Sequence, residues 1–277
     1  MTALTAVASP RALHRAARLW LVGTGLALVV LVGGLVIANV IFQRRMVRDI
    51  ENDQVAAVTQ QRLVDWALAD HEAGLADEVG RLARSGDLKD AIIGGKREEL
   101  RDQLEPPLNR LRKGPLAVIR LTLYTVDGRL RMHAQDSDDV GASEIYERRL
   151  LGVALHERRI VKGLEVLSGV PYLLAASPIY HEGKVIGFLE MGASLASVAR
   201  LLHAVSGAQI GVRMTDGAVI ETATPEIIRE ALHSAAPAAK ASRHVGHNDQ
   251  RPFVVTTVPL TSFSGAAVGH IVLVSDV

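Results

Sequence analysis

The chain contains no cysteine, few aromatic residues and no excess of either charge. The absence of cysteine excludes disulfides and thiolate metal sites, and it fits both oxidising and reducing compartments. Aromatic residues make up only 4% of the 277 residues, so a binding pocket must be built largely from aliphatic and charged side chains. The 31 Lys and Arg residues nearly balance the 30 Asp and Glu residues. This balance provides no basic surface for nucleic acid.

Motifs of catalysis are also missing. The stretch from His156 to Ile160 lacks the second histidine of a zinc-protease motif, and Gly94-Gly95-Lys96 lacks the flanking residues of a phosphate-binding loop. No G-x-S-x-G nucleophile motif occurs. His244 and His247 lack a full metal-ligand set. We therefore expect no catalytic residue, no metal and no cofactor, and the chain is predicted not to be an enzyme.

One long uncharged run stands near the start of the chain, from Leu19 to Phe42. As an α-helix it is longer than the ~30 Å hydrocarbon core of a bilayer, so it predicts a transmembrane helix at residues 19–42. A cleaved signal peptide is the alternative, but the run is too long for its apolar region and no A-x-A site follows. Basic residues flank both ends equally. Because long following domains are translocated largely regardless of charge, we expect residues 1–18 in the cytoplasm.

The next segment, residues 43–84, has no proline and is predicted to be a long stalk helix. Its apolar residues fall at spacings typical of a one-sided helix stripe: Val64, Leu68, Leu75, Val79 and Leu82. We expect this stripe to pack on a folded domain or on a second copy of the chain. A further helix is predicted from Leu88 to about Leu111, with Gly94-Gly95 as its weak point.

Two later stretches resemble each other, Val170–Leu195 and Arg251–Val277. Each reads as two strands joined by a polar turn, and each follows an Asp-Gly hairpin signal, Asp127-Gly128 or Asp216-Gly217. Chance similarity is the alternative. The repeat predicts an α+β fold with two lobes of similar topology, each an antiparallel sheet flanked by helices. The further elements expected are strands at 117–125, 160–167, 172–177 and 185–191, helices at 144–158, 193–204 and 225–234, a hairpin at 210–222, and the least ordered segment at 235–248.

The run from Gly163 to Gly192 (GLEVLSGVPYLLAASPIYHEGKVIGFLEMG), together with Leu123–His133 (LYTVDGRLRMH), resembles the double Cache sensory domains of bacterial transmembrane receptors. The resemblance covers roughly residues 55–277. It implies two PAS-like lobes on a long N-terminal helix, a membrane-distal lobe at 85–195 and a membrane-proximal lobe at 196–277. Such domains occur in chemoreceptors, sensor kinases and diguanylate cyclases. Relatives with this GLE run often carry an arginine in the following strand, where this chain has Tyr172-Leu173-Leu174.

Five residues are predicted to form a ligand site in the distal lobe. Tyr124, Arg131 and His133 fall on the polar faces of the first two strands, and Glu165 and Tyr172 lie on strands expected to close the same concavity. Converging charged and aromatic groups on an apolar lobe are typical of a small-ligand pocket. The alternative is that Arg131 and Glu165 form an ordinary ion pair while the tyrosines pack in the core.

The function expected from these features is ligand sensing. The chain is predicted to be the periplasmic sensory region of a single-pass inner-membrane receptor that binds a small polar or anionic molecule in the distal lobe. It is expected to work as a parallel homodimer and to pass a conformational signal across the membrane to an effector in the same chain or in a partner chain. The alternative is a membrane-tethered interaction or assembly protein whose lobe holds no ligand.

Overall fold

The computed structural model describes residues 53–134, 148–221, 231–232, 240–248 and 251–276. From Gln54 onward the chain forms one compact unit. The membrane helix predicted at residues 19–42 lies outside the described residues. Among the helices that are described, none combines the length and the apolarity needed to cross a bilayer.

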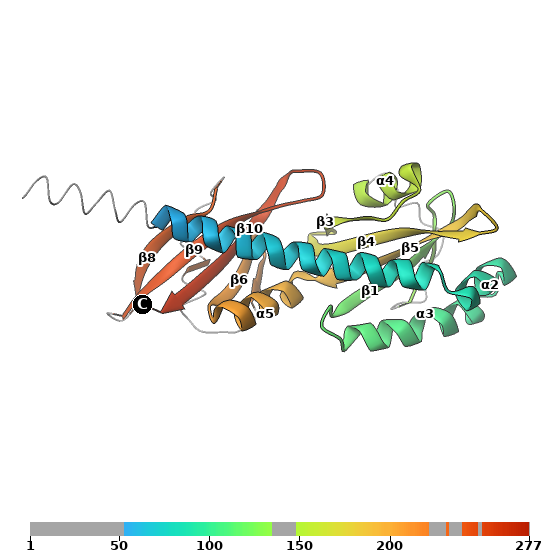
Figure 1. The fold of residues 1–277 in the computed structure, drawn as a ribbon, viewed down its shortest axis with the longest axis horizontal. Helices are drawn as coiled ribbons and strands as arrows, with labels where there is room; N and C mark the ends of the chain where they lie inside the picture. Colours follow the sequence, from blue (N-terminus) through green and yellow to red (C-terminus); the bar gives the residue numbers. More distant parts are fainter. Residues whose placement is uncertain (1–52, 135–147, 222–230, 233–239, 249–250, 277) are drawn as a thin grey trace, which may run out of the picture. The chain divides into compact units, whose positions relative to one another are not determined.

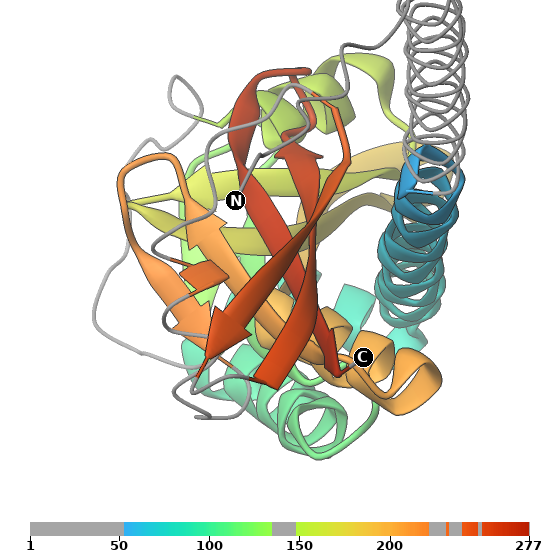
Figure 2. The same ribbon diagram turned by 90° about the vertical axis from the view of Figure 1, so that its left-hand side faces the viewer.

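A long helix, described from residue 53 to residue 83, runs beside both sheets of the unit (Figures 1 and 2). Its predicted apolar stripe is buried, since Val64, Leu75 and Val79 have no exposed surface. These side chains belong to one hydrophobic core that also contains residues of both sheets, such as Leu121 and Ile271. The stripe therefore packs within its own chain. The expectation that it serves as a contact surface for a second copy is wrong.

The described residues of the first lobe form three helices and five strands. They are α2 (Gly86–Gly94), α3 (Arg97–Arg112), α4 (Arg149–Glu157), β1 (Val118–Tyr124), β2 (Leu130–His133), β3 (Val161–Leu167), β4 (Val170–His181) and β5 (Lys184–Ser194). The sheet is antiparallel with the order β2-β1-β5-β4-β3. The single helix predicted at 88–111 is divided, because Gly95 takes a left-handed conformation with φ of 74° and ends α2.

The second lobe repeats this arrangement. Its elements are α5 (Leu195–Ser206), β6 (Gln209–Met214), β7 (Val219–Glu221), β8 (Ser242–Asn248), β9 (Arg251–Thr261) and β10 (Ala267–Asp276). The strand order is β7-β6-β10-β9-β8, which matches the first sheet position by position. The predicted duplication of two antiparallel lobes is confirmed. The prediction that 235–248 is the least ordered segment is wrong for β8, which pairs with β9 along its full length.

Corresponding glycines in the two sheets show why the repeat is visible in the sequence. A Cβ on Gly187 in β5 would lie 2.8 Å from the carbonyl oxygen of Tyr124, and a Cβ on Gly269 in β10 would lie 2.5 Å from that of Arg213. Each glycine thus lies where β5 or β10 passes the C-terminal end of its neighbouring strand, β1 or β6. Only a residue without a side chain fits there, so both copies retain glycine.

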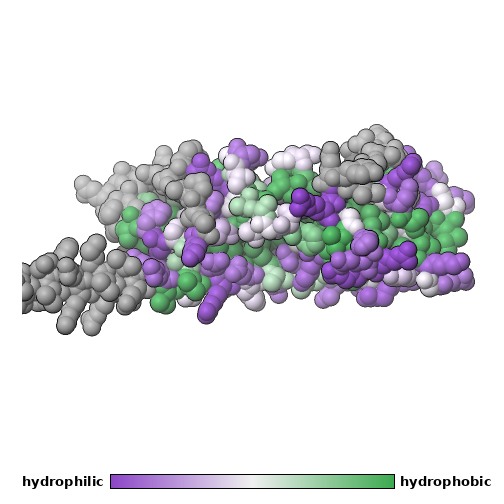
Figure 3. Space-filling model, turned by 90° about the horizontal axis from the view of Figure 1, so that it is seen from above, coloured by the Kyte–Doolittle hydropathy of each residue, from purple (hydrophilic) through white to green (hydrophobic). Residues whose placement is uncertain are grey.

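The two faces of the first sheet pack differently. Leu121 and Leu123 of β1 face the shared core with the long helix, α2 and α3, as the alternation of β1 predicts. Tyr124, on the other face, packs in a separate cluster with Leu150 and Leu151 of α4. Figure 3 shows hydrophobic residues gathered mainly on the half of the molecule that carries this lobe, interleaved with hydrophilic ones. Glu165 of β3 lies close to the start of α4.

Candidate functional site

A row of aligned strand positions places a carboxylate in the middle of the first sheet. Glu190 of β5 lies opposite Thr122 of β1 and opposite Ala176 of β4, so the three residues share the face that α4 covers. Glu190 and Thr122 have no exposed surface. Because Ala176 is small, there is room above the sheet beside Glu190 for another side chain. A buried carboxylate requires a cation or hydrogen-bond donors to offset its lost hydration.

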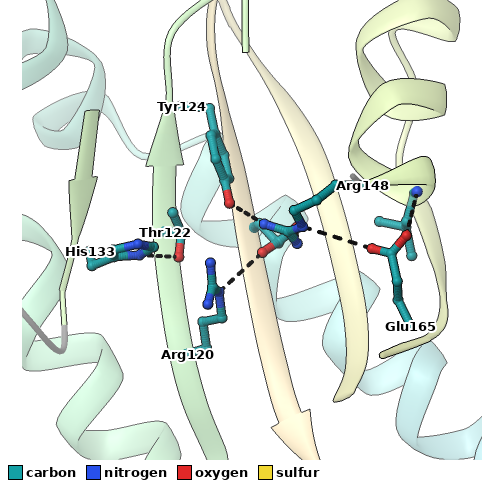
Figure 4. A network of polar contacts seen from close by, with 8 residues as sticks. Arg120, Thr122, Tyr124, His133, Arg148 and Glu165 are labelled. Carbon is teal, nitrogen blue, oxygen red and sulfur yellow. Dashed lines mark hydrogen bonds and ion pairs between the residues drawn. The ribbon is translucent and has the colours of Figure 1, made fainter. Parts of the chain in front are cut away.

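Arg148, immediately before α4, supplies that cation. Its side chain is only 3% exposed and reaches over the sheet, where one terminal nitrogen pairs with Glu190 and the other donates to the hydroxyl of Tyr124 (Figure 4). The guanidinium carbon also lies 5.7 Å from the centre of the Tyr124 ring, within the range of a cation–π interaction. Arg148 thus links β1, β5 and the start of α4.

Glu165 of β3 completes the cluster from the other side. Its Oε2 lies 3.8 Å from Nε of Arg148, and its Oε1 accepts a 3.2 Å hydrogen bond from the backbone N–H of Leu150. This bond satisfies one of the free N–H groups in the first turn of α4. Burial raises the pKa of Glu165, while the Leu150 N–H and the Arg148 charge act in the opposite direction. Glu165 therefore holds both Arg148 and the helix that carries it.

Two further polar contacts border the cluster on β1. Nε of Arg120 lies 3.5 Å from Oε1 of Glu190, and the Arg120 side chain is 18% exposed. Oγ1 of Thr122 lies 2.9 Å from Nδ1 of His133 on β2 (Figure 4). The polar groups therefore extend across the sheet from β2 to β3, with Arg148 at the centre.

Charge within the cluster is balanced. Arg120 and Arg148 supply two positive charges against the carboxylates of Glu165 and Glu190. Burial disfavours the charged guanidinium of Arg148, but Glu190, Tyr124 and Glu165 together outweigh this effect, so the pKa of Arg148 is raised. Arg148 is therefore a fixed cation.

Four of the five predicted site residues lie in or beside the cluster, and Arg131 does not. Tyr124 and Glu165 belong to the cluster, and His133 borders it through Thr122. Tyr172 lies opposite Glu165 on β4 and packs against the cluster's apolar surroundings. Arg131 is not brought to this cluster, because its guanidinium donates a 2.8 Å hydrogen bond to the carbonyl of Ile92 in α2.

A bulge explains the position of Arg131. In the β1–β2 pairing Tyr124 lies opposite Leu130, whereas the preceding Leu123 lies opposite Met132. Arg131 is the extra residue between these pairs, so the alternation counted along β2 does not hold there. Bulges commonly redirect a side chain in this way. Arg131 accordingly donates its hydrogen bond to the backbone near the end of α2.

The two central residues of the cluster, Arg148 and Glu190, were not predicted from the sequence. Glu190 carried a usable signal, because it is the single charged residue in the apolar run from Val185 to Ala193. A lone carboxylate in a buried strand must find a partner inside the protein. Arg148 carried no such signal, since its neighbour Arg149 is identical in type but exposed.

The sequence and the fold were compared with known proteins. Residues 62–277 match the family described as "Double sensory domain of two-component sensor kinase", and the chain belongs to this family. The predicted relationship to double Cache sensory domains is therefore confirmed. Among curated protein sequences no significant match is found.

Several solved structures have a similar fold at low sequence identity. The periplasmic domain of Vibrio cholerae LuxQ has a TM-score of 0.54 at 13% identity, over 80% of this chain and 100% of that chain. The ligand-binding domain of the Pseudomonas aeruginosa PAO1 amino acid chemoreceptor PctC, in complex with GABA, has a TM-score of 0.46 at 16% identity, over 81% and 100%. The sensor domain of the Vibrio cholerae histidine kinase DctB has a TM-score of 0.46 at 14% identity, over 80% and 98%. At these identities the likeness concerns the fold alone.

Proposed function

We propose that the chain is the ligand-sensing region of a membrane-anchored bacterial receptor and that its ligand binds at the cluster around Arg148. The observation that carries this proposal is the buried ionic network of Arg148, Glu190 and Glu165 on the α4 face of the first lobe. Buried ion pairs contribute little net stability compared with apolar packing. A network of this size inside a small lobe is therefore better explained by recognition than by folding.

The balanced charge of the network limits the class of ligand. A simple anion has to compete with Glu190 for Arg148, and a simple cation has to compete with Arg148 for the carboxylates. A small polar molecule that exchanges hydrogen bonds with Tyr124, Arg148 and Glu165 meets no such competition. We infer a small polar ligand and revise the expectation that it is held by Arg131.

We infer that the start of α4 transmits the conformational signal of ligand binding. Arg148 stands at its N-terminus, and Glu165 accepts a hydrogen bond from its first turn. A ligand that draws either side chain away from its partner changes the position of α4. Glu165 is also adjacent to Leu164, whose carbonyl accepts a 2.6 Å hydrogen bond from the backbone N–H of Phe263 in the β9–β10 hairpin. This bond offers a direct route from the first lobe to the second.

Membrane anchoring and dimerisation complete the proposal. The uncharged run at residues 19–42 supports a single membrane helix, with residues 1–18 in the cytoplasm and the sensory lobes in the periplasm. The long helix exposes Val55, Val58 and Trp66 by 67%, 50% and 49% of their surfaces. At 100° per residue these three positions fall on one side of the helix. This side, rather than the buried stripe, is the surface we propose for a parallel homodimer.

A second candidate function is favoured by the same network. The terminal nitrogens of Arg148 already pair with Glu190 and Tyr124, which is also what a lobe without a ligand requires. On this alternative the chain is a membrane-tethered interaction or assembly protein, and the cluster only fixes α4 to the sheet.

A thermal-shift screen with small polar metabolites separates the two functions. A ligand that binds the folded state alone raises the melting temperature in a concentration-dependent manner. The sensing proposal predicts at least one such compound, with its effect lost in Glu165→Gln and retained in Arg131→Met. No stabilising compound, or equal stabilisation of both variants and the wild type by every stabilising compound, would contradict a site at this cluster.

A further inference from the structure

A groove outside the first-lobe cluster lies where the long helix, the α3–β1 connection and α5 meet. Its volume is about 650 Å³, within the roughly 300–1,000 Å³ typical of small-molecule sites. The connection packs directly on the helix, because a Cβ on Gly74 would lie 2.9 Å from Cδ2 of Leu116. Ala73, Pro115 and Leu201 add apolar lining. The groove is therefore formed by closely packed elements.

A buried histidine without a partner lines this groove. His71 is 5% exposed, and neither ring nitrogen makes a hydrogen bond to any residue that the structure describes. The Ala67 carbonyl, one helical turn earlier, acts on the ring electrostatically but does not meet hydrogen-bond geometry. Burial is the main influence on the pKa of His71 and lowers it, which favours the neutral ring. It presents one donor and one acceptor that a bound molecule can satisfy.

The walls of the groove carry opposite charges. Asp70 and Asp77 stand on the long helix, while Arg112 and Lys113 stand at the end of α3 and Arg200 on α5. Within the described part of the chain none of the five forms an ion pair. Carboxylates thus line one side of the groove and cations line the others, without neutralising each other across it.

We propose that this groove is a second binding site, which takes a small zwitterion with its carboxylate toward Arg200 and His71 and its ammonium group toward Asp70 and Asp77. A ligand with one charge would satisfy one wall and leave the other unmatched. A ligand with both charges satisfies both walls and supplies the imidazole with a hydrogen-bond partner. The groove shares no residue with the Arg148 cluster, so this proposal does not depend on the function proposed above.

The test uses the full chain with ¹³C-labelled histidine, and the probes are glycine, β-alanine and 5-aminovalerate. The His71 signal, assigned with His71→Gln, is followed by NMR as each probe is added. At least one zwitterion is expected to shift this signal saturably. Arg200→Met and Asp70→Asn each remove one charge–charge contact, and each should raise the Kd about tenfold or more. Acetate and methylammonium, added separately or together, should produce no saturable shift.

Matched controls make the outcome decisive. Arg200 and Asp70 are exposed, so their replacement leaves the core intact, which an unchanged melting temperature verifies. Arg110→Met removes an exposed arginine of α3 that does not line the groove and should leave the Kd unchanged. Arg148→Met should also leave it unchanged. The proposal is overturned if none of the three zwitterions shifts the His71 signal, if acetate binds as tightly as they do, or if Arg200→Met has no effect.

Discussion

Replacing Arg148 by methionine tests how the ionic network is held together. The substitution removes the cation that pairs with Glu190, whose side chain has no exposed surface. Arg120, at 3.5 Å, is the remaining nearby cation, and its geometry is poorer. Removing one partner of a buried ion pair costs about 3–5 kcal/mol, because the other charge stays buried without compensation. For a domain of this size each kcal/mol corresponds to about 2–4 °C, so the melting temperature should fall by about 6–20 °C.

The assay is thermal unfolding followed by circular dichroism, with Arg149→Met as the control. Arg149 is the next residue in the chain and is exposed, so its replacement should change stability by less than about 0.5 kcal/mol. Replacing both Arg148 and Glu190, as Arg148→Met with Glu190→Leu, should recover part of the loss, with a coupling energy of about 1–3 kcal/mol. If Arg148→Met melts within 2 °C of Arg149→Met, the two side chains are not paired as described and the reasoning is refuted.

Three further predictions concern a carboxyl group, a strand contact and the helix surface. Burial raises the pKa of Glu165 above 4.5, so the protonated carboxyl group stabilises the folded state at low pH and this stabilisation is lost as pH rises. The melting temperature of Glu165→Gln should therefore rise relative to that of the wild type between pH 4.5 and 7. A difference that stays constant over this range would argue against the raised pKa. Gly269→Ala should cost about 1–3 kcal/mol in chemical denaturation, because its Cβ would lie 2.5 Å from a carbonyl oxygen, whereas Gly152→Ala, with nothing within 4 Å, should cost nothing. In a chain without cysteine, Val58→Cys in membranes should form a disulfide with a second copy while the buried Val64→Cys should not; equal crosslinking at both would count against the proposed dimer surface.

Local signals in the sequence were sufficient for much of the fold. Asp127-Gly128 and Asp216-Gly217 form the predicted turns, and in both the glycine has a positive φ, 77° and 91°. The alternation of β1 correctly separated Leu121 and Leu123 from the polar face. These features depend on a residue and its immediate neighbours, which is why the sequence alone reveals them.

Features that depend on distant partners were missed. β8 is polar, with Ser242, Arg243 and His244 at its start, and it is a strand because the backbone of β9 pairs with it. As the edge strand of its sheet it needs no apolar alternation. Arg148 could not be distinguished from Arg149 because its burial depends on Glu190, 42 positions later in the chain. The sequence therefore pointed to the same sheet as the cluster now proposed as the site, but to Arg131 instead of Arg148.

The most direct test of the account is a crystal structure of the chain with a compound that stabilises the wild type but not Glu165→Gln in the thermal-shift screen. The account predicts density for that compound on the α4 face of the first sheet, within hydrogen-bond distance of Arg148 or Glu165, and a change in the contact between Arg148 and Glu190. Density for the compound at any other place, with the Arg148–Glu190 pair unaltered, would contradict the assignment of this cluster as the sensory site.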